Sequence, residues 1–388
     1  MNLERTRIKN LCEIIMGQSP KSQFYNDEGN GIPFFQGKGD YAERHPVIRI
    51  FTTQVTKRAR PNDILFTVRA PVGELNLCNV DCCIGRGLAA IRPAEANNYL
   101  FYLLKHSRQI FFGRSSGAIF ESISKDVLSD TELLFHPKEG HRARIGSILF
   151  AYDTLLENNG TRMALLEKSA RHLYREWFVQ LRFPGYEHAK IVKGVPEGWI
   201  KSQLAHYTEA ITRGITPQYE EGTGFTVINQ KCIRDGQLSL EFAREHKNEV
   251  PTRKLVRLGD VLVNSTGEGT LGRVAQVRRE LQRHTFDSHV TIVRPKQEIP
   301  KWYFGFSIMK LEPLLSVLGR GATNQTELSN ATISEMDFVL PNKKVTNEFE
   351  KIIEPIINQL ENISSQNKLL GEARDLLLPK LMSGEIEV

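Results

Sequence analysis

The 388-residue chain lacks the sequence features of secretion, membrane insertion and metal binding. Its N-terminus, MNLERTRIKN, is charged and has no apolar core like that of a signal peptide. Nowhere do roughly 18 or more apolar residues follow one another, as a membrane span requires. The cysteines are odd in number and show no repeated pair spacing, so we expect mostly buried free thiols and no zinc site: Cys12, Cys78, Cys82, Cys83 and Cys232. These absences predict a cytoplasmic protein that contacts no membrane and binds no metal.

Catalytic motifs are also missing. The sequence has no G-x-x-x-x-G-K-[ST] phosphate loop, no G-x-S-x-G elbow, no H-E-x-x-H helix and no Asn-Pro-Pro-aromatic tetrapeptide. Residues 267–272 (GEGTLG) match G-x-G-x-x-G and follow a predicted strand at 260–264. The residues after them alternate like a strand and do not open a helix, so we interpret the motif as a glycine-rich turn. We expect no catalytic residue and no cofactor bound by this chain.

The composition is that of a globular protein with a mild basic excess. Hydrophobic residues make up 40% and charged residues 25% of the chain. A net charge of +6 is compatible with nucleic-acid binding but does not require it. The basic residues gather in stretches that are either phosphate contacts or solvated surface: Lys57, Arg58, Arg60 and Arg69; Arg253, Lys254 and Arg257; Arg273, Arg278, Arg279 and Arg283.

The chain repeats itself with a period of about 200 residues, which indicates a duplicated domain. RPNDILFTVRAPVGELNL from Arg60 corresponds to RLGDVLVNSTGEGTLGRV from Arg257, and the strands LAAIRP and VTIVRP follow at Pro93 and Pro295. Each half continues with an apolar helical stretch from Tyr99 or Trp302, a loop of small residues, and a strand that stops at proline, ELLFHP or DFVLP. Five features in the same order are poorly explained by chance.

After each of these last strands the hydrophobic period becomes 3.5 residues, the pattern of a coiled-coil seam. The first series is Ile145, Leu149, Tyr152, Leu156, Asn159, Met163, Leu166, Ala170, Leu173 and Trp177. The second is Phe349, Ile353, Ile356, Leu360, Ile363, Asn367, Leu370, Arg374, Leu377 and Leu381. Asn159 and Asn367 either set the register of the seam or are simply packed or exposed polar residues.

Together these patterns predict an α+β protein. Two similar globular α/β domains are separated by two long helices that form an antiparallel coiled coil with pseudo-twofold symmetry. The expected boundaries are a first domain at 1–137, a central helix at 138–181, a connecting segment at 182–198, a second domain at 199–341 and a C-terminal helix at 342–388. The connecting segment is rich in glycine and proline and too polar to be buried.

The loops of both halves carry side chains that suit DNA. Arg and Lys pair with guanine, Asn and Gln pair with adenine, and Ser and Thr suit phosphates. We predict DNA contacts in the first half at Gln18, Ser19, Lys38, Arg58, Arg69, Arg114, Ser115 and Ser116. In the second half we predict them at Arg213, Thr216, Asn229, Gln230, Lys231, Asn264, Ser265, Thr266, Thr270, Arg273, Arg320, Thr323, Asn324 and Gln325.

Five segments resemble a known family. Val195-Pro196-Glu197-Gly198-Trp199, followed by Arg213-Gly214-Ile215-Thr216-Pro217, is similar to the entry of a target recognition domain in the specificity subunits of type I restriction–modification systems. Gly17-Gln18-Ser19-Pro20 is similar to the entry of the first such domain. The segment ARHLYREWF at 170–178 and the ending ARDLLLPKLMSGEI at 373–386 are similar to the helices of the family. The likeness extends over essentially the whole chain, although the first half has no Pro-Glu-Gly-Trp before its entry.

The resemblance implies a non-catalytic subunit that reads a bipartite, asymmetric site on double-stranded DNA. It also implies assembly with two modification subunits, which use S-adenosylmethionine to methylate adenine, and two restriction subunits, which use ATP and Mg²⁺. The helices would be the docking surface for the modification subunits. Two alternatives remain: a scaffold that uses only the coiled coil, and a methyltransferase–specificity fusion with an unrecognised catalytic part.

Overall fold

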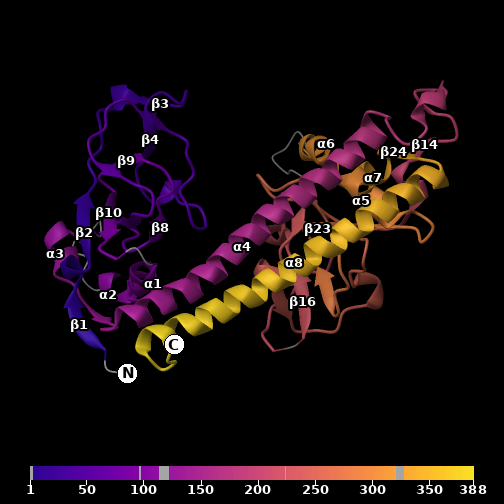
Figure 1. Ribbon diagram of the computed structural model, residues 1–388. Helices are drawn as coiled ribbons and strands as arrows, with labels where there is room; N and C mark the ends of the chain where they lie inside the picture. Colours follow the sequence, from indigo (N-terminus) through magenta and orange to yellow (C-terminus); the bar gives the residue numbers. More distant parts are fainter. Residues whose placement is uncertain (1–2, 96–97, 113–121, 223, 320–326) are drawn as a thin grey trace. The chain divides into compact units, whose positions relative to one another are not determined.

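The computed structural model describes residues 3–95, 98–112, 122–222, 224–319 and 327–388, and its ribbon is shown in Figure 1. The chain divides into two compact units. Unit 1 consists of residues 1–158 together with 367–388, and unit 2 consists of residues 159–366. Each unit therefore contains one globular half and part of each long helix. In the described ranges no helix is long and apolar enough to cross a membrane.

Unit 1 is built around an antiparallel sheet of four strands. Their order is β2 (Cys12–Met16), β10 (Leu88–Pro93), β7 (Ile64–Thr67) and β8 (Leu75–Leu77). Both central strands are almost wholly buried, because β7 is apolar at three of its four positions and β10 opens with Leu-Ala-Ala-Ile. A smaller sheet orders β3 (Tyr25–Asn26), β5 (Phe51–Thr52), β4 (Ile32–Phe35), β9 (Cys82–Ile84) and β6 (Arg58–Ala59), with β4 and β9 parallel.

Short helices and one strand pair complete the first globular half. Helices α1 (Tyr99–His106) and α2 (Arg108–Phe112) bury Tyr99, Tyr102 and Phe111 against the four-stranded sheet. Helix α3 (Lys125–Ser129) begins at Ser124, whose hydroxyl accepts a hydrogen bond from Val127 N, as an N-cap does. Strand β1 (Glu4–Arg7) pairs with β11 (Glu132–Phe135), which joins the start of the chain to the strand before the long helix.

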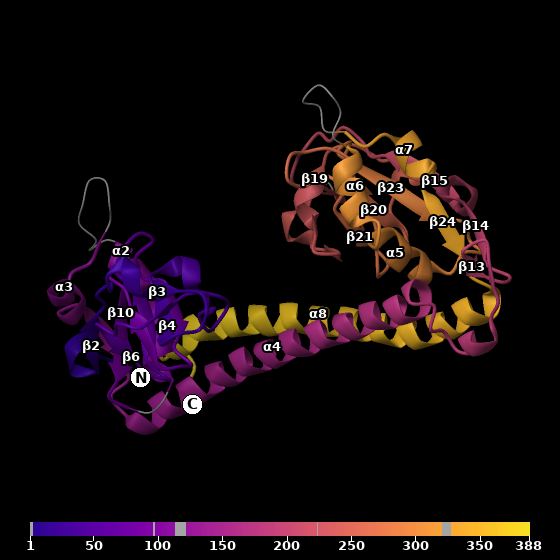
Figure 2. The ribbon, with the colours of Figure 1, turned by 90° about the horizontal axis from the view of Figure 1, so that it is seen from above.

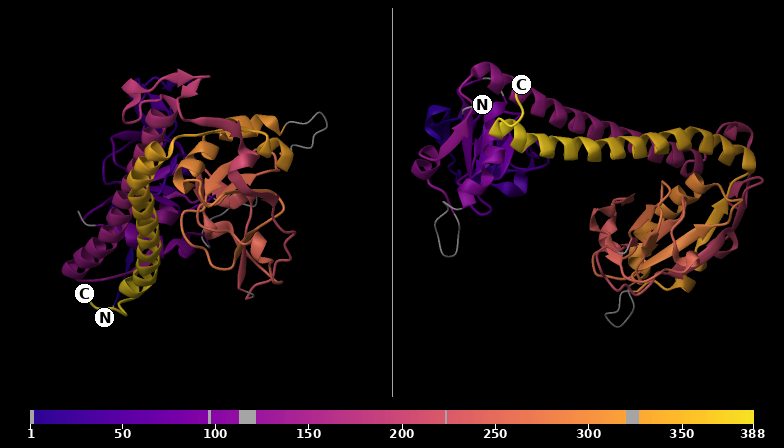
Figure 3. Two further views of the ribbon diagram at one scale, coloured as in Figure 1. Left: turned by 90° about the vertical axis from the view of Figure 1, so that its right-hand side faces the viewer. Right: turned by 90° about the horizontal axis from the view of Figure 1, so that it is seen from below.

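Unit 2 repeats this order of elements. Its four-stranded sheet is β15 (Thr208–Arg213), β23 (Val290–Pro295), β20 (Val261–Asn264) and β21 (Val274–Gln276), seen among the pink and orange strands of Figure 3. Its second sheet is β19 (Arg244–His246), β16 (Phe225–Ile228) and β22 (His284–Phe286), and β16 and β22 are parallel. The helices are α5 (Lys301–Met309), α6 (Glu312–Leu318) and α7 (Asn330–Ser334), and β14 (Ile200–Gln203) pairs with β24 (Asp337–Leu340). Two small hairpins are added, β12 (Ile191–Val192) with β13 (Val195–Pro196) and β17 (Ile233–Arg234) with β18 (Gln237–Leu238).

The two halves also share individual side-chain hydrogen bonds. In unit 1 Arg92 donates from Nε and Nη2 to the two Asp63 carboxylate oxygens at 2.9 and 2.8 Å. In unit 2 Arg294 makes the same pair of bonds to Asp260 at 2.8 and 2.7 Å. A bidentate pair of this kind fixes the central strand against the turn before the neighbouring strand. The two halves therefore correspond in the order of their backbone elements and in one bidentate ion pair.

The two long helices are α4 (Glu139–Tyr174), of 36 residues, and α8 (Lys343–Ser383), of 41 residues. A short π-helical turn (Arg175–Val179) continues α4. All twenty positions of the predicted seams are buried or half-buried. Leucines off the seam remain exposed, with Leu165 at 60%, Leu369 at 65% and Leu376 at 67%. The predicted periodicity therefore identifies the inward face of both helices.

Within each unit the two helices run in opposite directions. In unit 2 the end of α4 meets the start of α8, because Phe178 lies 4.9 Å from Phe349 between ring centroids (Figure 2). In unit 1 the start of α4 meets the end of α8, where Ile145 and Leu381 share a core. Arg374 Nη1, at a predicted seam position, donates to Asp153 Oδ1 at 2.6 Å. The arginine is thus accommodated at this seam position because it pairs with an aspartate on the other helix.

Three smaller predictions are confirmed. All five cysteines are buried free thiols. The GEGTLG segment is a turn between the antiparallel strands β20 and β21, and its glycines 267, 269 and 272 all have positive φ. Most of segment 182–198 is exposed or half-buried, with Phe183 and Pro196 as buried anchors.

Candidate nucleic-acid interface

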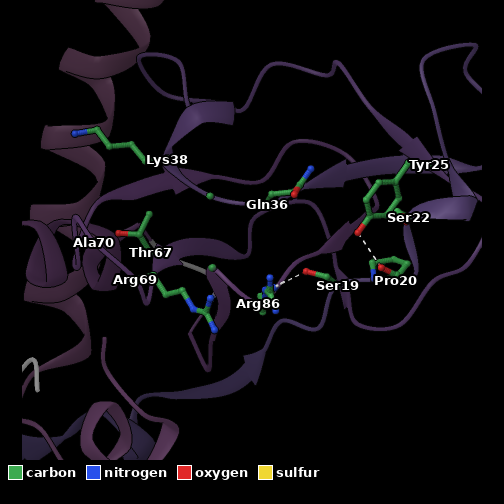
Figure 4. A pocket seen from close by; sticks show the side chains of 12 residues that line it. Ser19, Pro20, Ser22, Tyr25, Gln36, Lys38, Thr67, Arg69, Ala70 and Arg86 are labelled. Atoms are coloured by element: carbon green, nitrogen blue, oxygen red, sulfur yellow. Dashed lines mark hydrogen bonds between the residues drawn. The ribbon is translucent and has the colours of Figure 1, made fainter. Parts of the chain in front are cut away.

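A polar pocket of about 500 Å³ opens in unit 1 where several loops leave the sheets (Figure 4). Ser19, Ser22 and Tyr25 come from the loop after β2, Gln36 and Lys38 from the turn after β4, Thr67 and Arg69 from the end of β7, and Arg86 from the turn between β9 and β10. Three of these residues are cationic, and among the described residues no carboxylate lines the pocket. The pocket therefore suits a ligand that offers hydrogen-bond acceptors and negative charge.

The three cations differ in their contacts with the described part of the chain. Lys38 Nζ donates to Glu74 Oε1 at 3.1 Å. Arg69 and Arg86 are exposed, and within the described residues neither guanidinium makes an ion pair or a hydrogen bond. Figure 4 shows the Arg69 side chain extending toward Arg86. An unpaired guanidinium in a polar pocket is arranged to bind a phosphate or the O6 and N7 acceptors of guanine.

Close backbone approaches hold this pocket in shape. A Cβ atom at Gly17 would lie 2.1 Å from Gly85 O, and one at Gly87 would lie 2.3 Å from Gln36 O. Only glycine permits such approaches. Arg86 N donates to Ser19 Oγ at 3.2 Å, which joins the loop after β2 to the Arg86 turn. The pocket is consequently formed by backbone that is fixed before any ligand arrives.

Unit 2 has the same backbone with different side chains. Val68 N donates to Gly87 O at 2.9 Å in unit 1, and Ser265 N donates to His289 O at 2.8 Å in unit 2. Gly85 N donates to Phe35 O, and Asp287 N donates to Ile228 O. These bonds align Gly37 with Gln230, Arg69 with Thr266 and Gly87 with His289. Where unit 1 has two glycines and an arginine, unit 2 therefore has a glutamine, a threonine and a histidine.

The predicted contacts of unit 1 fall in two places. Ser19, Lys38 and Arg69 line the pocket, and Gln18 is exposed beside Ser19. Arg58 is exposed on β6 and does not line the pocket. The sequence thus identified three residues that line the pocket. It did not show that the separate loops carrying them form one pocket.

In unit 2 the prediction is wrong for Asn264 and Ser265 as direct contacts, because both side chains are fully buried. Asn264 Nδ2 donates to Gln230 O at 3.2 Å, and Ser265 Oγ donates to Val263 O at 3.3 Å. Their polarity suggested a surface loop, whereas they end a buried strand. The Asn264 amide thereby ties the strand end to the loop at Gln230.

The other predicted residues of unit 2 are half-buried or exposed, but several are engaged internally. Gln230 and Thr266 are joined by hydrogen bonds, while Thr216 and Lys231 are exposed. Asn229 caps the turn that carries Lys231, and its Nδ2 donates to Phe242 O at 2.6 Å. Arg213 pairs with Glu327 at 2.5 Å, and Arg273 Nη2 donates to Gly269 O at 2.9 Å. Thr270 Oγ1 donates to Gly267 O at 3.3 Å.

Seven predicted contacts lie outside the described residues: Arg114, Ser115, Ser116, Arg320, Thr323, Asn324 and Gln325. The residues that follow these two segments are described and correspond between the units. Ser122 forms a bridge with Arg69, and Glu327 forms a bridge with Thr266. Ser122 and Glu327 therefore lie beside corresponding positions of the two units.

Sequence reasoning missed Arg86 and His289. Both stand in the short turn before the strands LAAIRP and VTIVRP. Extending the alignment of the halves by a few residues toward the N-terminus would have paired GRG at 85–87 with DSH at 287–289. The pairing would have shown a polar turn whose side chains differ between the halves. Among the residues described, no three or more His, Cys, Asp or Glu side chains are placed to hold a metal ion.

Known proteins share both the sequence and the fold. Residues 2–168 match the family model described as type I restriction modification DNA specificity domain. The chain is 24% identical to the type I restriction enzyme MjaIX specificity subunit of Methanocaldococcus jannaschii over 98% of this chain and 93% of that protein. Residues 2–168 therefore carry a type I restriction–modification DNA specificity domain, and the chain is similar to a specificity subunit over nearly its whole length.

Two further comparisons agree with this assignment. The chain is 33% identical to the HindI specificity subunit of Haemophilus influenzae over 84 residues, which are 22% of this chain and 18% of that protein. Its fold matches the crystal structure of a type I restriction–modification S subunit from M. genitalium with a TM-score of 0.69 at 16% identity, over 98% of this chain and 96% of the other. Specificity subunits are not enzymes, and DNA recognition is the role of the matched domain.

Proposed function

We propose that this specificity subunit reads a bipartite, asymmetric DNA site, with one half-site for each unit. The observation that carries the proposal is the contrast between one shared backbone and two sets of side chains. Gly37, Arg69 and Gly87 in unit 1 correspond to Gln230, Thr266 and His289 in unit 2. Two identical readers would favour a symmetric site, whereas two different readers favour an asymmetric one.

In unit 1 the reading groups would be the unpaired arginines of the pocket. A guanidinium that donates to O6 and N7 of guanine distinguishes guanine from the other bases. Arg58 lies outside the pocket, and a phosphate contact suits its position because it would add affinity without selecting a base. The base sequence would therefore be read by Arg69 and Arg86 with the polar residues beside them.

The paired helices would form a coiled coil with pseudo-twofold symmetry that sets the gap between the half-sites. Their exposed leucines at 165, 369 and 376 support a second role, as a surface for the modification subunits. We propose an assembly with two modification and two restriction subunits. In this assembly S-adenosylmethionine, ATP and Mg²⁺ are used by the partners, and the specificity subunit directs adenine methylation or cleavage to its site.

Mapping methylated adenines in the host genome tests the proposal. With the gene intact we expect methylation at a motif of two short specified blocks separated by unspecified bases. Deleting the gene should remove methylation from every copy of that motif. A continuous motif, or a motif that survives the deletion, would contradict the proposal.

The competing enzyme and scaffold hypotheses make different predictions. A methyltransferase fusion would bind S-adenosylmethionine as a purified chain, so saturable heat release in calorimetry would overturn our proposal. A scaffold would show no preference among DNA sequences once the partner subunits are added. The specificity subunit should bind no S-adenosylmethionine and should impose a sequence preference on the assembled complex.

A further inference from the structure

The turn between β22 and β23 carries an exposed histidine whose backbone is held on both sides. His289 N donates to Asp287 Oδ1 at 2.9 Å, and His289 O accepts from Ser265 N at 2.8 Å. Val290 N donates to Asp287 O at 3.1 Å and closes the turn. The Asp287 side chain is buried, whereas His289 itself is exposed. The Cα of His289 is thus fixed while its ring remains open to a ligand.

The ring is fixed as well. Thr266 Oγ1 lies 2.7 Å from His289 Nδ1. Gln230 Nε2 donates to the same hydroxyl oxygen at 3.0 Å and to Thr266 O at 2.7 Å. Backbone and side-chain bonds together hold the imidazole in one position, which is the preorganisation expected of a recognition group.

This network also favours one tautomer of the ring. The Thr266 hydroxyl oxygen accepts from Gln230, so its own hydrogen is free to be donated. Among the described residues His289 Nδ1 is the one acceptor within hydrogen-bond distance of that hydroxyl. When Nδ1 accepts, the neutral ring carries its proton on Nε2, so the group presented to a ligand is an N–H donor.

We infer that His289 is a sequence-determining residue of unit 2, with Thr266 and Gln230 as its positioning residues. The inference rests on the proposed function and names the chemistry that this unit would read. A single N–H donor suits an acceptor on a base edge, whereas a phosphate is bound more strongly by Arg and Lys side chains. In the major groove guanine, adenine and thymine offer an acceptor, whereas cytosine offers only its N4 donor. His289 would therefore exclude cytosine at one position of its half-site.

Unit 1 lacks this hydrogen-bonded histidine at the corresponding backbone positions. Gly87 replaces His289, Gly37 replaces Gln230, and Arg69 replaces Thr266. A Cβ at Gly87 would meet Gln36 O at 2.3 Å, so unit 1 has no room for a side chain at the histidine position without a backbone shift. The hydrogen-bonded histidine would consequently act only on the half-site that unit 2 reads.

The test uses the full chain, expressed from its own gene in its host, with methylated adenines mapped across the genome. His289→Ala should lower the discrimination against cytosine at one position of one half-site by about tenfold, since a base contact of this kind contributes that much selectivity. The other half-site should be unchanged. Thr266→Val should relax the same position because it frees the ring, and Thr266→Ser, which keeps the hydroxyl, should restore the wild-type motif.

His206→Asn is the matched control. His206 Nδ1 also lies beside a hydroxyl, Ser202 Oγ at 2.6 Å, but it belongs to the 3-10 turn Leu204–Tyr207 before β15. This variant should methylate the wild-type motif.

The outcomes separate the inference from the function on which it rests. If the wild-type chain produces no bipartite motif, the proposed function fails. If the wild-type chain produces one and His289→Ala leaves it unchanged, or relaxes both half-sites, the inference about His289 is overturned. Should His289→Ala abolish methylation altogether, Thr266→Val decides: a relaxed single position supports the inference, and an unchanged motif overturns it.

Discussion

Single side chains distinguish the two units at positions where the backbone is shared. Arg69 corresponds to Thr266, and Gly87 corresponds to His289. The sequence predicted Arg69 and Thr266 as contacts because arginine suits guanine and threonine suits phosphates. It also predicted Asn264 and Ser265, which are buried, because residue type does not show which way a side chain turns at a strand end. That direction depends on the packing of β20 against its neighbours, which no local pattern encodes.

The arginine pocket gives a prediction at this scale. Replacing Arg69 or Arg86 by alanine should weaken the preference for guanine at one position of the first half-site by about 1–3 kcal/mol, because a bidentate contact to that base is lost. Methylation mapping would show the position relaxed while the second half-site is retained. Arg5→Ala is the control, since Arg5 is exposed on β1 outside the pocket. A general loss of methylation at all sequences would instead assign the arginines to phosphates.

The two bidentate ion pairs differ in burial, which gives a second prediction. In unit 2 the Arg294 and Asp260 side chains are 4% and 1% exposed, whereas Arg92 of unit 1 is 28% exposed. Asp260→Asn should lower the free energy of unfolding of unit 2 by about 3 kcal/mol, because it leaves a buried guanidinium without its counter-charge. All three tryptophans, 177, 199 and 302, belong to unit 2, so their fluorescence during urea unfolding reports this loss. Asp63→Asn should shift that transition little, and an equal shift would contradict this account.

At the scale of elements, one contact between α8 and α5 should make stability depend on pH. Glu350 Oε1 accepts from Tyr303 N at 2.7 Å in the first turn of α5. Burial raises the pKa of the Glu350 carboxyl from 4.5 to about 7, against the opposing effect of backbone hydrogen bonds. A carboxyl whose pKa is raised by folding stabilises the fold fully below its unfolded pKa and loses that contribution as the pH rises through the folded value.

Unit 2 should therefore lose on the order of 2 kcal/mol of stability between about pH 4.5 and pH 7.5 through this group. Glu350→Gln keeps an acceptor for Tyr303 N and removes the titration, so its stability should vary less over the same range. Tryptophan-detected unfolding at several pH values would measure the difference. Parallel pH profiles for the wild type and the variant would show that Glu350 is not the group responsible.

The helices were the elements best predicted from sequence. The heptad positions locate the inward face of α4 and α8, because a long helix with one buried stripe shows its period without help from the rest of the fold. Both helix starts were predicted to within one residue, since the expected starts at 138 and 342 compare with Glu139 and Lys343. The expected ends at 181 and 388 lie beyond the observed last residues, Tyr174 and Ser383.

For the whole molecule, the proposed coiled coil should act as a ruler. Inserting seven residues into each helix, between 158 and 159 and between 366 and 367, keeps the seam in register and adds about 10 Å of helix. The preferred gap between half-sites should then lengthen by about three base pairs at 3.4 Å each. The same motif with an unchanged gap would show that the helices do not set the spacing. A matched insertion in one helix only should disrupt the seam and serves as the control.

The central claim is that the two units of this specificity subunit read separate half-sites through different side chains on one backbone. Genome-wide mapping of methylated adenines for Arg69→Ala, His289→Ala and the double variant tests it most directly. We predict that each single variant relaxes one position in one half-site, that the two half-sites differ, and that the double variant combines both changes without a further effect. Relaxation of both half-sites by either single variant would contradict the claim.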